Sequence, residues 1–385
     1  VGCNDRRVSV GHGRRMINTW GGTIVAPSFQ IAVFDGDGIG PEIMQPTLEI
    51  LTKLADHGGY NLELLTCAAG ASHYAQTGVS LPESSMDTAC AADAILLSAM
   101  GLPDVRYPDG TEISPQIDLR KALGLFAGVR PVRIFPGLNT PLNLPEGRSV
   151  DFVLIRESTE GLFHTQGCGE VTETEARETL LITKEVSQKL FAFAFDLAQA
   201  RQDAGRGLGR VTCVDKANVF RAFAFFRALF DDEARKHPHM NADHAYVDAT
   251  ALWFVTKPWE FDVLVTENMF GDILSDLGAG LMGGLGVAPS ADIGARHAVF
   301  QPCHGSAPDI AGQGVANPMA MILSAAMMLD WLGREHATPQ LREDATKLEA
   351  AVEAVIAAGD ARTADMGGSA TTQEAALAVQ ARLQV

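Results

Sequence analysis

The sequence predicts an α/β protein built on a largely parallel central sheet. Short apolar runs rich in β-branched residues recur along the chain, and longer segments with apolar residues at helical spacing separate them. Strands that alternate with helices form parallel sheets, because each helix carries the chain back to the end of the sheet at which the preceding strand began. The length of 385 residues fits one large or two ordinary domains, and 46% hydrophobic residues supply a globular core.

Six runs are predicted to be strands because they are short, apolar and bounded by polar or small residues. They lie at 30–34, 93–99, 151–157, 210–216, 244–249 and 261–267. Six longer segments are predicted to be helices from their apolar spacing. They lie at 178–200, 217–237, 266–280, 316–333, 339–359 and 371–383. Candidate domain boundaries are the Pro- and Gly-containing segments 136–147 and 280–286.

The charge balance argues against several classes of partner. The net charge is −17 and the isoelectric point is near 5.0, whereas nucleic acids and anionic membranes require clustered Lys and Arg. No apolar run reaches the ~18 residues of a membrane span. Residues 1–29 have no hydrophobic stretch suited to a secretory signal, and we interpret them as an extension before the first strand. We expect a cytoplasmic protein that binds neither nucleic acid nor membrane.

The stretch GDGIGPE at 36–42 follows the first predicted strand. Its glycines give the pattern GxGxG, not the GxGxxG of a dinucleotide-binding turn, and Pro41 follows at once. Two interpretations stay open at this point. The turn either lets the backbone approach a ligand or is purely structural.

Three arginines and a lysine are further candidates: DLRKALGLFAGVRPVR contains Arg120 and Arg130, and Arg156 lies at the end of the strand predicted at 151–157. Arg120, Arg130 and Arg156 suggest an anionic substrate, because a guanidinium group binds a planar carboxylate through two hydrogen bonds. The alternative is that they form ordinary surface ion pairs. Lys216 and Asn218 lie just past the strand at 210–216, where a desolvated lysine can act as a base and an exposed lysine is simply solvated.

Two aspartates lie one turn apart on the helix predicted at 266–280. Asp272 and Asp276 are neighbours at i and i+4, and like charges there cost a few tenths of a kcal/mol. Either both are solvated or a cation lies between them. Asp248, predicted at the end of another strand, would complete an all-oxygen site of the kind that Mg²⁺ or Mn²⁺ prefers.

The segment 301–318 is rich in small residues and contains His304, Asp309 and Asn317. Small residues let the backbone approach a ligand closely. A carboxylate beside an adenosine ribose accepts hydrogen bonds from its hydroxyls and repels a 2′-phosphate. The alternative is an ordinary loop that leads into the next helix.

Taken together, these motifs resemble one enzyme family. GDGIGPE, RESTEG, VDKANV, YVDA, TENMFGDILSDL and HGSAPDIAGQGVANP occur in this order over residues 31–318. They look like the β-decarboxylating dehydrogenases (the isocitrate/isopropylmalate dehydrogenase family), and the segments around TENMFGDILSDL and HGSAPDIAG are most similar to the isopropylmalate branch. The resemblance implies an isopropylmalate dehydrogenase-like fold, which is not a Rossmann fold. The implied large, cofactor-binding domain comprises 30–125 plus 284–385, and the small domain for dimerisation and substrate comprises 126–283.

The resemblance also implies the chemistry, an oxidative decarboxylation of a malate-type 2-hydroxy acid with NAD and Mg²⁺ or Mn²⁺. It implies a homodimer with shared active sites. The implied catalytic residues are Lys216, as base, and Asp248. The implied metal ligands are Asp272, Asp276 and Asp248 of the partner subunit. The implied substrate-binding residues are Ser114, Gln116, Arg120, Arg130, Arg156 and Asn218. The implied cofactor-binding residues are Glu267, Asn268, His304, Gly305, Ser306, Ala307, Asp309 and Asn317, with Asp309 favouring NAD over NADP.

Two positions depart from the family pattern. Phe163 occupies the position of the family's catalytic tyrosine, and a phenyl ring donates no proton. We hypothesise that His164 or a water replaces the tyrosine; slow or absent decarboxylation is the alternative.

In the specificity segment 110–120, Ser114, Gln116 and Ile117 stand where isopropylmalate enzymes carry leucines. We therefore expect a malate with a polar or small substituent to be preferred over 3-isopropylmalate.

Other functions stay open on the sequence alone. Within the family, tartrate or D-malate and isocitrate or homoisocitrate are rival substrates. A metal-dependent hydrolase or phosphotransferase would use the same three acids, but it leaves the Asp309 loop unexplained and the chain has no P-loop. A catalytically weakened binding protein is suggested by Phe163, although an idle site need not keep the three arginines and Lys216.

Overall fold

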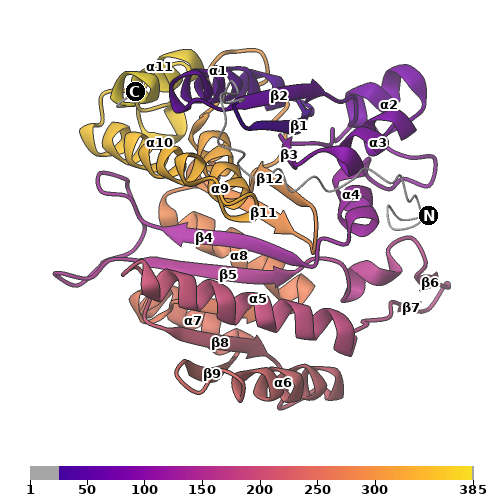
Figure 1. The fold of residues 1–385 in the computed structure, drawn as a ribbon. Helices are drawn as coiled ribbons and strands as arrows, with labels where there is room; N and C mark the ends of the chain where they lie inside the picture. Colours follow the sequence, from indigo (N-terminus) through magenta and orange to yellow (C-terminus); the bar gives the residue numbers. More distant parts are fainter. Residues whose placement is uncertain (1–25, 384–385) are drawn as a thin grey trace, which may run out of the picture.

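A computed structural model describes residues 26–383, and its centre is one ten-stranded sheet (Figure 1). The strand order is β2-β1-β3-β12-β11-β4-β5-β10-β8-β9. These strands are β1 (Ser28–Phe34), β2 (Asn61–Thr66), β3 (Ala94–Leu97), β4 (Ala127–Arg133), β5 (Asp151–Glu157), β8 (Arg210–Asp215), β9 (Asn241–Tyr246), β10 (Val263–Thr266), β11 (Pro289–Ile293) and β12 (Ala298–Pro302). A separate two-stranded ribbon consists of β6 (Glu170–Val171) and β7 (Ala176–Arg177).

Helices surround this sheet. They are α1 (Gly40–Gly58), α2 (Ala71–Thr77), α3 (Glu83–Ala91), α4 (Pro115–Leu123), α5 (Lys184–Asp203), α6 (Arg221–Ala234), α7 (Val247–Thr256), α8 (Asn268–Met282), α9 (Met319–Glu335), α10 (Pro339–Ala358) and α11 (Thr372–Arg382). Short 3₁₀ helices are η2 (Leu162–Thr165), η3 (Pro258–Glu260), η4 (Leu285–Val287) and η5 (Ala364–Met366). None of the helices within residues 26–383 combines the length and hydropathy that a membrane span requires.

The predicted α/β class with a largely parallel sheet is confirmed. Strand pairs toward both ends of the sheet are parallel, and the pairs β12–β11, β11–β4 and β4–β5 at its centre are antiparallel. β3 and β10 are buried at every position, because helices cover both faces of the sheet. α5 contacts β5 from one face, and α8 contacts β4 and β5 from the other (Figure 1).

Several predicted boundaries were wrong. The segment predicted as a strand at 244–249 is strand only to Tyr246, and Asp248 lies in the first turn of α7. The helix predicted from 178 begins at Lys184, after Thr183, whose side chain caps it. The strand predicted from 30 begins at Ser28, and residues 1–25 of the predicted N-terminal extension lie outside the described residues.

The predicted division into two domains falls between β11 and β4. These strands are hydrogen-bonded neighbours, with Ala291 opposite Val129, so the sheet runs through the predicted boundary without a break. The strands on one side of it come from 30–125 and 284–385, and those on the other side come from 126–283. The division itself remains a prediction.

Candidate active site

A cavity of about 240 Å³ lies where α4, α8 and η2 meet β4, β5, β11 and β12. Arg130 of β4 and Arg156 of β5 line it from neighbouring strands, and Arg120 lines it from the last turn of α4. Side chains alternate between the two faces of a strand. Arg130 and Arg156 therefore point to the α8 face, whereas Val129 of β4 points to the other face. The structure brings together the three arginines that the sequence analysis named.

Asp292, which the sequence analysis missed, is the buried counter-ion of two of these arginines. Its carboxylate lies 3.0 Å from Nε of Arg120 and 3.3 Å from Nη2 of Arg130. The amide of Gln301 donates a further hydrogen bond to it at 2.7 Å. Burial alone would raise the pKa of Asp292, but the charges of the three arginines outweigh burial and hold that pKa below its usual value. Asp292 is therefore an anion that fixes the cationic wall.

Gly128 of β4 makes space for this carboxylate. A Cβ at Gly128 would lie 3.1 Å from Oδ1 of Asp292 and 2.6 Å from Oγ of Ser158. Ser158 donates to the same Oδ1 at 3.3 Å. A larger residue at 128 would push the carboxylate away from the arginines.

Three groups hold the guanidinium of Arg156 in place. Its Nε donates to Asn268 at 2.9 Å, and another of its nitrogens forms an ion pair with Asp272. Its guanidinium carbon also lies 5.1 Å from the centre of the Phe163 ring. Burial, and then repulsion from Arg120, lowers the pKa of Arg156 to about 10, so it stays charged near pH 7.

Asp272 and Asp276 both line the cavity from α8. Glu267 caps the start of this helix by accepting from the backbone of Phe270, and Gly283 ends it with a φ of 116°. Burial raises the pKa of Asp276, and the charge of Asp272 raises it further. Two repelling carboxylates on one wall are a donor set that suits a divalent cation, because hard cations bind oxygen ligands. These residues therefore fit the implied metal.

The described part of a single chain does not complete such a metal site. Within residues 26–383, no group of three His, Cys, Asp or Glu side chains could hold an ion. Asp248 does not line the cavity, so it is not brought to Asp272 and Asp276 within one chain. A third protein carboxylate would have to come from outside these residues.

Lys216 and Asp248 instead form an ion pair on the surface. Nζ of Lys216 lies 2.5 Å from Oδ1 of Asp248, whose side chain is 68% exposed. This hydrogen bond lowers the pKa of Asp248. Asn218 is exposed beside the pair and, like both of its members, does not line the cavity.

Large apolar side chains are exposed near this ion pair. They are Val219 and Phe220 just after Lys216, Leu252 and Val255 on α7, and Ile273 on α8. The helical spacing of Ile273 predicts burial, but 62% of its surface is exposed. α7 and α8 contact each other, so exposed apolar residues of both helices belong to one region. Such a patch is typical of a protein–protein interface.

Phe163 lines the cavity from η2, but its neighbour His164 does not. His164 is exposed, so the structure gives this imidazole no place in the cavity wall. Of the two proton donors in our hypothesis, the geometry favours a water.

The predicted specificity segment reaches the cavity through two of its three named residues. Gln116 and Ile117 of α4 line the cavity, whereas Ser114 precedes the helix and does not. Oε1 of Gln116 is buried and has no hydrogen-bond partner within residues 26–383. An unpaired buried carbonyl is costly, and a ligand that donates a hydrogen bond would satisfy it.

His304 and Gly305 also line the cavity. Burial lowers the pKa of His304, so its ring is neutral near pH 7, and Nδ1 lies 2.9 Å from the carbonyl of Gly305. Nδ1 therefore carries the proton and donates it, which leaves Nε2 as an acceptor. Nε2 is buried without a partner in the described chain. This acceptor fits an N–H or O–H group of a bound cofactor.

Side-chain hydrogen bonds hold other residues of this loop in place. Ser306 donates to the carbonyl of Gly101 at 2.5 Å, and Ala307 has a left-handed φ of 37°. Asn317 is buried, donates to Asp365 at 2.9 Å and accepts from the backbone of Met319. Asp309 is exposed.

The GDGIGPE turn supports this loop and does not face the cavity. Gly38 has a φ of 60°, and a Cβ there would lie 1.9 Å from the carbonyl oxygen of Ser306. The backbone of Ile39 donates to that carbonyl at 2.8 Å. Residues 36–42 do not line the cavity. Of the two interpretations of this turn, the structural one explains these contacts.

Glu267 and Asn268 are buried at the start of α8 and have partners within the chain. Asn268 donates to the carbonyl of Glu160 at 2.9 Å and accepts from Arg156. Burial raises the pKa of Glu267, and its Oε1 has no hydrogen-bond partner in the part of the chain described. Contact between these residues and a cofactor remains a prediction.

The sequence of this chain is similar to those of known proteins over most of its length. The model of the isocitrate/isopropylmalate dehydrogenase family matches residues 30–379. The chain is 40% identical over 357 residues to the 3-isopropylmalate/3-methylmalate dehydrogenase of Methanocaldococcus jannaschii, an alignment that covers 92% of this chain and 99% of that protein. It is 40% identical over 361 residues to the 3-isopropylmalate dehydrogenase of Streptococcus pneumoniae, with 92% and 99% covered.

Solved structures give the same result. The isocitrate dehydrogenase from Methylococcus capsulatus superposes with a TM-score of 0.80 at 34% identity. The superposition covers 93% of this chain and 100% of that chain. A β-decarboxylating dehydrogenase from Thermococcus kodakarensis superposes with a TM-score of 0.75 at 34% identity, covering 92% and 96%. The resemblance inferred from the motifs is confirmed.

Proposed function

We propose, from the premise that this chain belongs to the isocitrate/isopropylmalate dehydrogenase family, that the cavity beside α8 oxidises and decarboxylates a malate-type 2-hydroxy acid. The chain is a β-decarboxylating dehydrogenase that acts on a CH–OH group. The observation that carries the substrate proposal is the convergence of Arg120, Arg130 and Arg156 with Asp272 and Asp276 on one cavity of about 240 Å³.

With a divalent cation bound, the charge of the cavity wall would match a dianion. The three arginines are balanced by Asp292, Asp272 and Asp276, so the cation would leave two positive charges on that wall. A malate carries two carboxylates, and each can accept paired hydrogen bonds from a guanidinium group. The arginines would therefore hold the carboxylates and fix the hydroxyl carbon in place.

The family uses a nicotinamide cofactor and a divalent metal, and we propose NAD with Mg²⁺ or Mn²⁺ for this chain. Asp272 and Asp276, with Asp248 of the partner subunit, would hold the cation. When bound, the cation acts as a Lewis acid toward the substrate's oxygens. The buried, unpaired Nε2 of His304 and the exposed carboxylate of Asp309 would bind the adenosine end, and Asp309 would repel a 2′-phosphate.

The complete site would require a homodimer. Lys216 and Asp248 lie on the surface among exposed apolar side chains of α7 and α8, where a second copy would cover them. Lys216 would then act as base in the partner's cavity, directly or through a water. Phe163 provides no proton there, so we propose that a water protonates the product.

The substrate we favour carries a polar or small substituent. The unpaired carbonyl of Gln116 suits a hydrogen-bond donor on the substrate, and Ile117 beside it suits a small apolar group. The 3-isopropylmalate named for the relatives is the competing candidate.

A substrate panel tests this proposal. NADH formation would be followed with 3-isopropylmalate, 3-methylmalate, D-malate, tartrate and isocitrate, each with Mg²⁺ and with EDTA. We expect Mg²⁺-dependent oxidation with NAD and little with NADP, and faster turnover of the small or polar malates. Exclusive oxidation of 3-isopropylmalate would refute the substituent preference, and activity that survives EDTA would refute the metal.

A further inference from the structure

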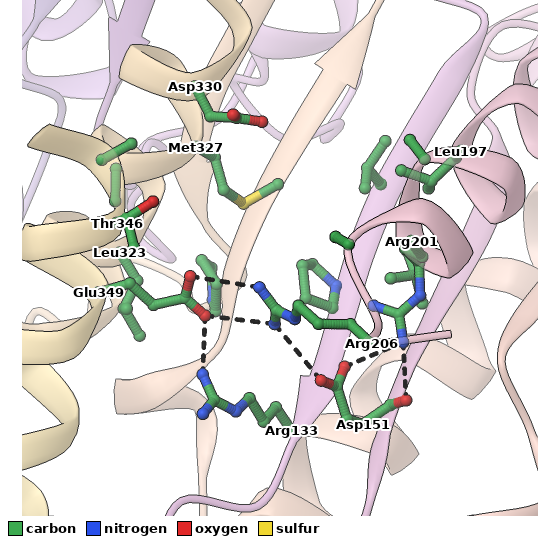
Figure 2. Close-up of a pocket in the computed structure, with 18 of the residues that line it drawn as sticks. Arg133, Asp151, Leu197, Arg201, Arg206, Leu323, Met327, Asp330, Thr346 and Glu349 are labelled. Carbon is green, nitrogen blue, oxygen red and sulfur yellow. Dashed lines mark hydrogen bonds and ion pairs between the residues drawn. The ribbon is translucent and has the colours of Figure 1, made fainter. Parts of the chain in front are cut away.

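A second, larger cavity of about 460 Å³ lies on the opposite face of β4 and β5 (Figure 2). Val129 of β4 and Val153 of β5 line this cavity, whereas Arg130 and Arg156 line the candidate active site. Because side chains alternate along a strand, the two cavities are separated by the sheet. We call the second one the rear cavity. Nothing in the proposed reaction uses it.

The walls of the rear cavity are mostly apolar. Leu197 of α5 faces Leu323 and Met327 of α9 across it (Figure 2). Its volume lies in the range of roughly 300–1,000 Å³ that small-molecule sites occupy. An apolar molecule of moderate size would therefore gain free energy by leaving water for this cavity.

One edge of the rear cavity carries excess positive charge. Arg334 and Arg342 share a single carboxylate, Asp330, and both bind it through Nε, at 2.8 and 3.3 Å. The terminal nitrogens of these two arginines have no hydrogen-bond partner in residues 26–383. Two guanidinium groups and one carboxylate leave one positive charge beside an apolar cavity, although the protein as a whole is strongly acidic. This edge is complementary to one carboxylate of a ligand.

The opposite edge is closed by an ion-pair network that joins the two predicted domains. Glu349 of α10 pairs with Arg133 of β4 at 2.8 Å and with Arg206 at 3.3 Å, and Arg206 pairs with Asp151 at 3.4 Å (Figure 2). Arg133 also pairs with Glu353 and Asp151 with Arg201, so every charge of this network has a partner within the protein. The network also shows that one wall of the cavity belongs to 284–385 and the other to 126–283.

We propose that the rear cavity binds a small monocarboxylate with an apolar body. Its carboxylate would bind Arg334 and Arg342, and its body would lie against Leu197, Leu323 and Met327. Such a molecule would hold the two walls at a fixed separation, and a change of angle between them alters the substrate cavity on the other face in the opposite sense. The binding step stands by itself, and the effect on catalysis rests on the proposed function.

Calorimetric titration with octanoate tests the binding step without any substrate. We expect saturable binding of one octanoate per chain, with acetate and 1-octanol at least tenfold weaker because each lacks one half of the ligand. Arg342→Gln removes part of the anion contact and should weaken octanoate about tenfold. Ala200→Phe fills the cavity from α5 and should abolish binding. The matched control Arg382→Gln breaks an exposed ion pair on α11, away from the cavity, and should bind octanoate as the wild type does.

The outcomes separate the two parts of the proposal. No saturable binding, or equal binding by wild type, Arg342→Gln and Ala200→Phe, would overturn the site. For the effect on catalysis, octanoate should change the KM for the hydroxy acid at least twofold in wild type and leave it unchanged in Ala200→Phe. Binding with no change in KM would overturn the coupling alone, and a chain that binds octanoate but oxidises no hydroxy acid would refute the proposed function and not the rear site.

Discussion

Arg120 and Asp292 lie 172 positions apart in the sequence and form a 3.0 Å ion pair in the wall of the substrate cavity. The carboxylate is fully buried and serves Arg130 as well. Removing one partner of a buried pair leaves an uncompensated charge, which costs far more than the net contribution of the pair itself. Asp292 is therefore the residue whose loss should damage the site most without touching substrate.

The first prediction concerns Asp292→Asn. The amide has the shape of the carboxylate but lacks its charge, so Arg120 and Arg130 would repel each other without compensation. We expect the free energy of unfolding to fall by about 3–5 kcal/mol in urea titrations. The control Asp360→Asn removes an exposed partner of Arg382 and should leave the free energy of unfolding unchanged within the error of the titration. A loss below about 1 kcal/mol for Asp292→Asn would show that Asp292 is not the counter-ion that holds the arginines.

The second prediction is the pH dependence of that difference. The pKa of Asp292 is lower in the folded state than its unfolded value of about 3.9. A lowered carboxylate pKa stabilises the fold fully above the unfolded value, and this contribution is lost as pH falls through the folded value. The difference in free energy of unfolding between wild type and Asp292→Asn should therefore be constant above about pH 5 and shrink below about pH 4. Urea titrations across this range measure it, and a difference that stays constant down to about pH 3 would contradict it.

Much of the fold was predictable because buried strands and helix faces consist mainly of apolar residues, which form a pattern in the sequence. The six predicted strands are all present, and the helices at 316–333, 339–359 and 371–383 correspond to α9, α10 and α11. β3 and β10 consist of buried residues at every position, so a plain apolar run identifies them.

Three of the strands that were missed, β4, β11 and β12, line the site. β4 contains Pro131 and two arginines, and β11 contains the buried Asp292. Pro131 is tolerated because β11 pairs with β4 only as far as Val129. A buried charge with its partner on another element has no local signal in the sequence. Arg120 and Arg130 were named because guanidinium groups suit carboxylate ligands, whereas no sequence pattern pointed to Asp292 as their counter-ion.

The third prediction tests the proton path. Phe163→Tyr places a phenolic O–H on a ring that already lines the cavity and contacts Arg156. If proton delivery by water limits decarboxylation, we expect kcat to rise at least about tenfold, since a positioned acid contributes about 10²–10⁴-fold. His164→Ala should leave kcat unchanged because His164 is exposed. Loss of turnover in His164→Ala would show that the imidazole, and not water, donates the proton.

The fourth prediction concerns substrate choice at Gln116. Gln116→Leu removes the unpaired carbonyl from the cavity wall and replaces it with an apolar side chain. We expect the ratio of kcat/KM for 3-isopropylmalate to that for D-malate to rise about tenfold or more, because discrimination by a pocket follows lost or gained contacts. Ser114→Ala is the control, since Ser114 precedes the helix and does not line the cavity. An unchanged ratio in Gln116→Leu would remove Gln116 from the specificity of this site.

The last prediction tests whether two chains share each site. Lys216 lies in an ion pair with Asp248 on the surface, away from the cavity that Asp272 lines, so the base and the metal ligand of one site should come from different subunits. Lys216→Ala and Asp272→Asn should each be inactive alone. After subunit exchange, a mixed dimer has one site with both native groups and one with neither, and a statistical mixture should regain about a quarter of wild-type activity. Native mass spectrometry of the mixture confirms the exchange. If mixed dimers form and remain inactive, Lys216 and Asp272 serve the same chain's site, and the interface proposed around α7 and α8 is not where catalysis is completed.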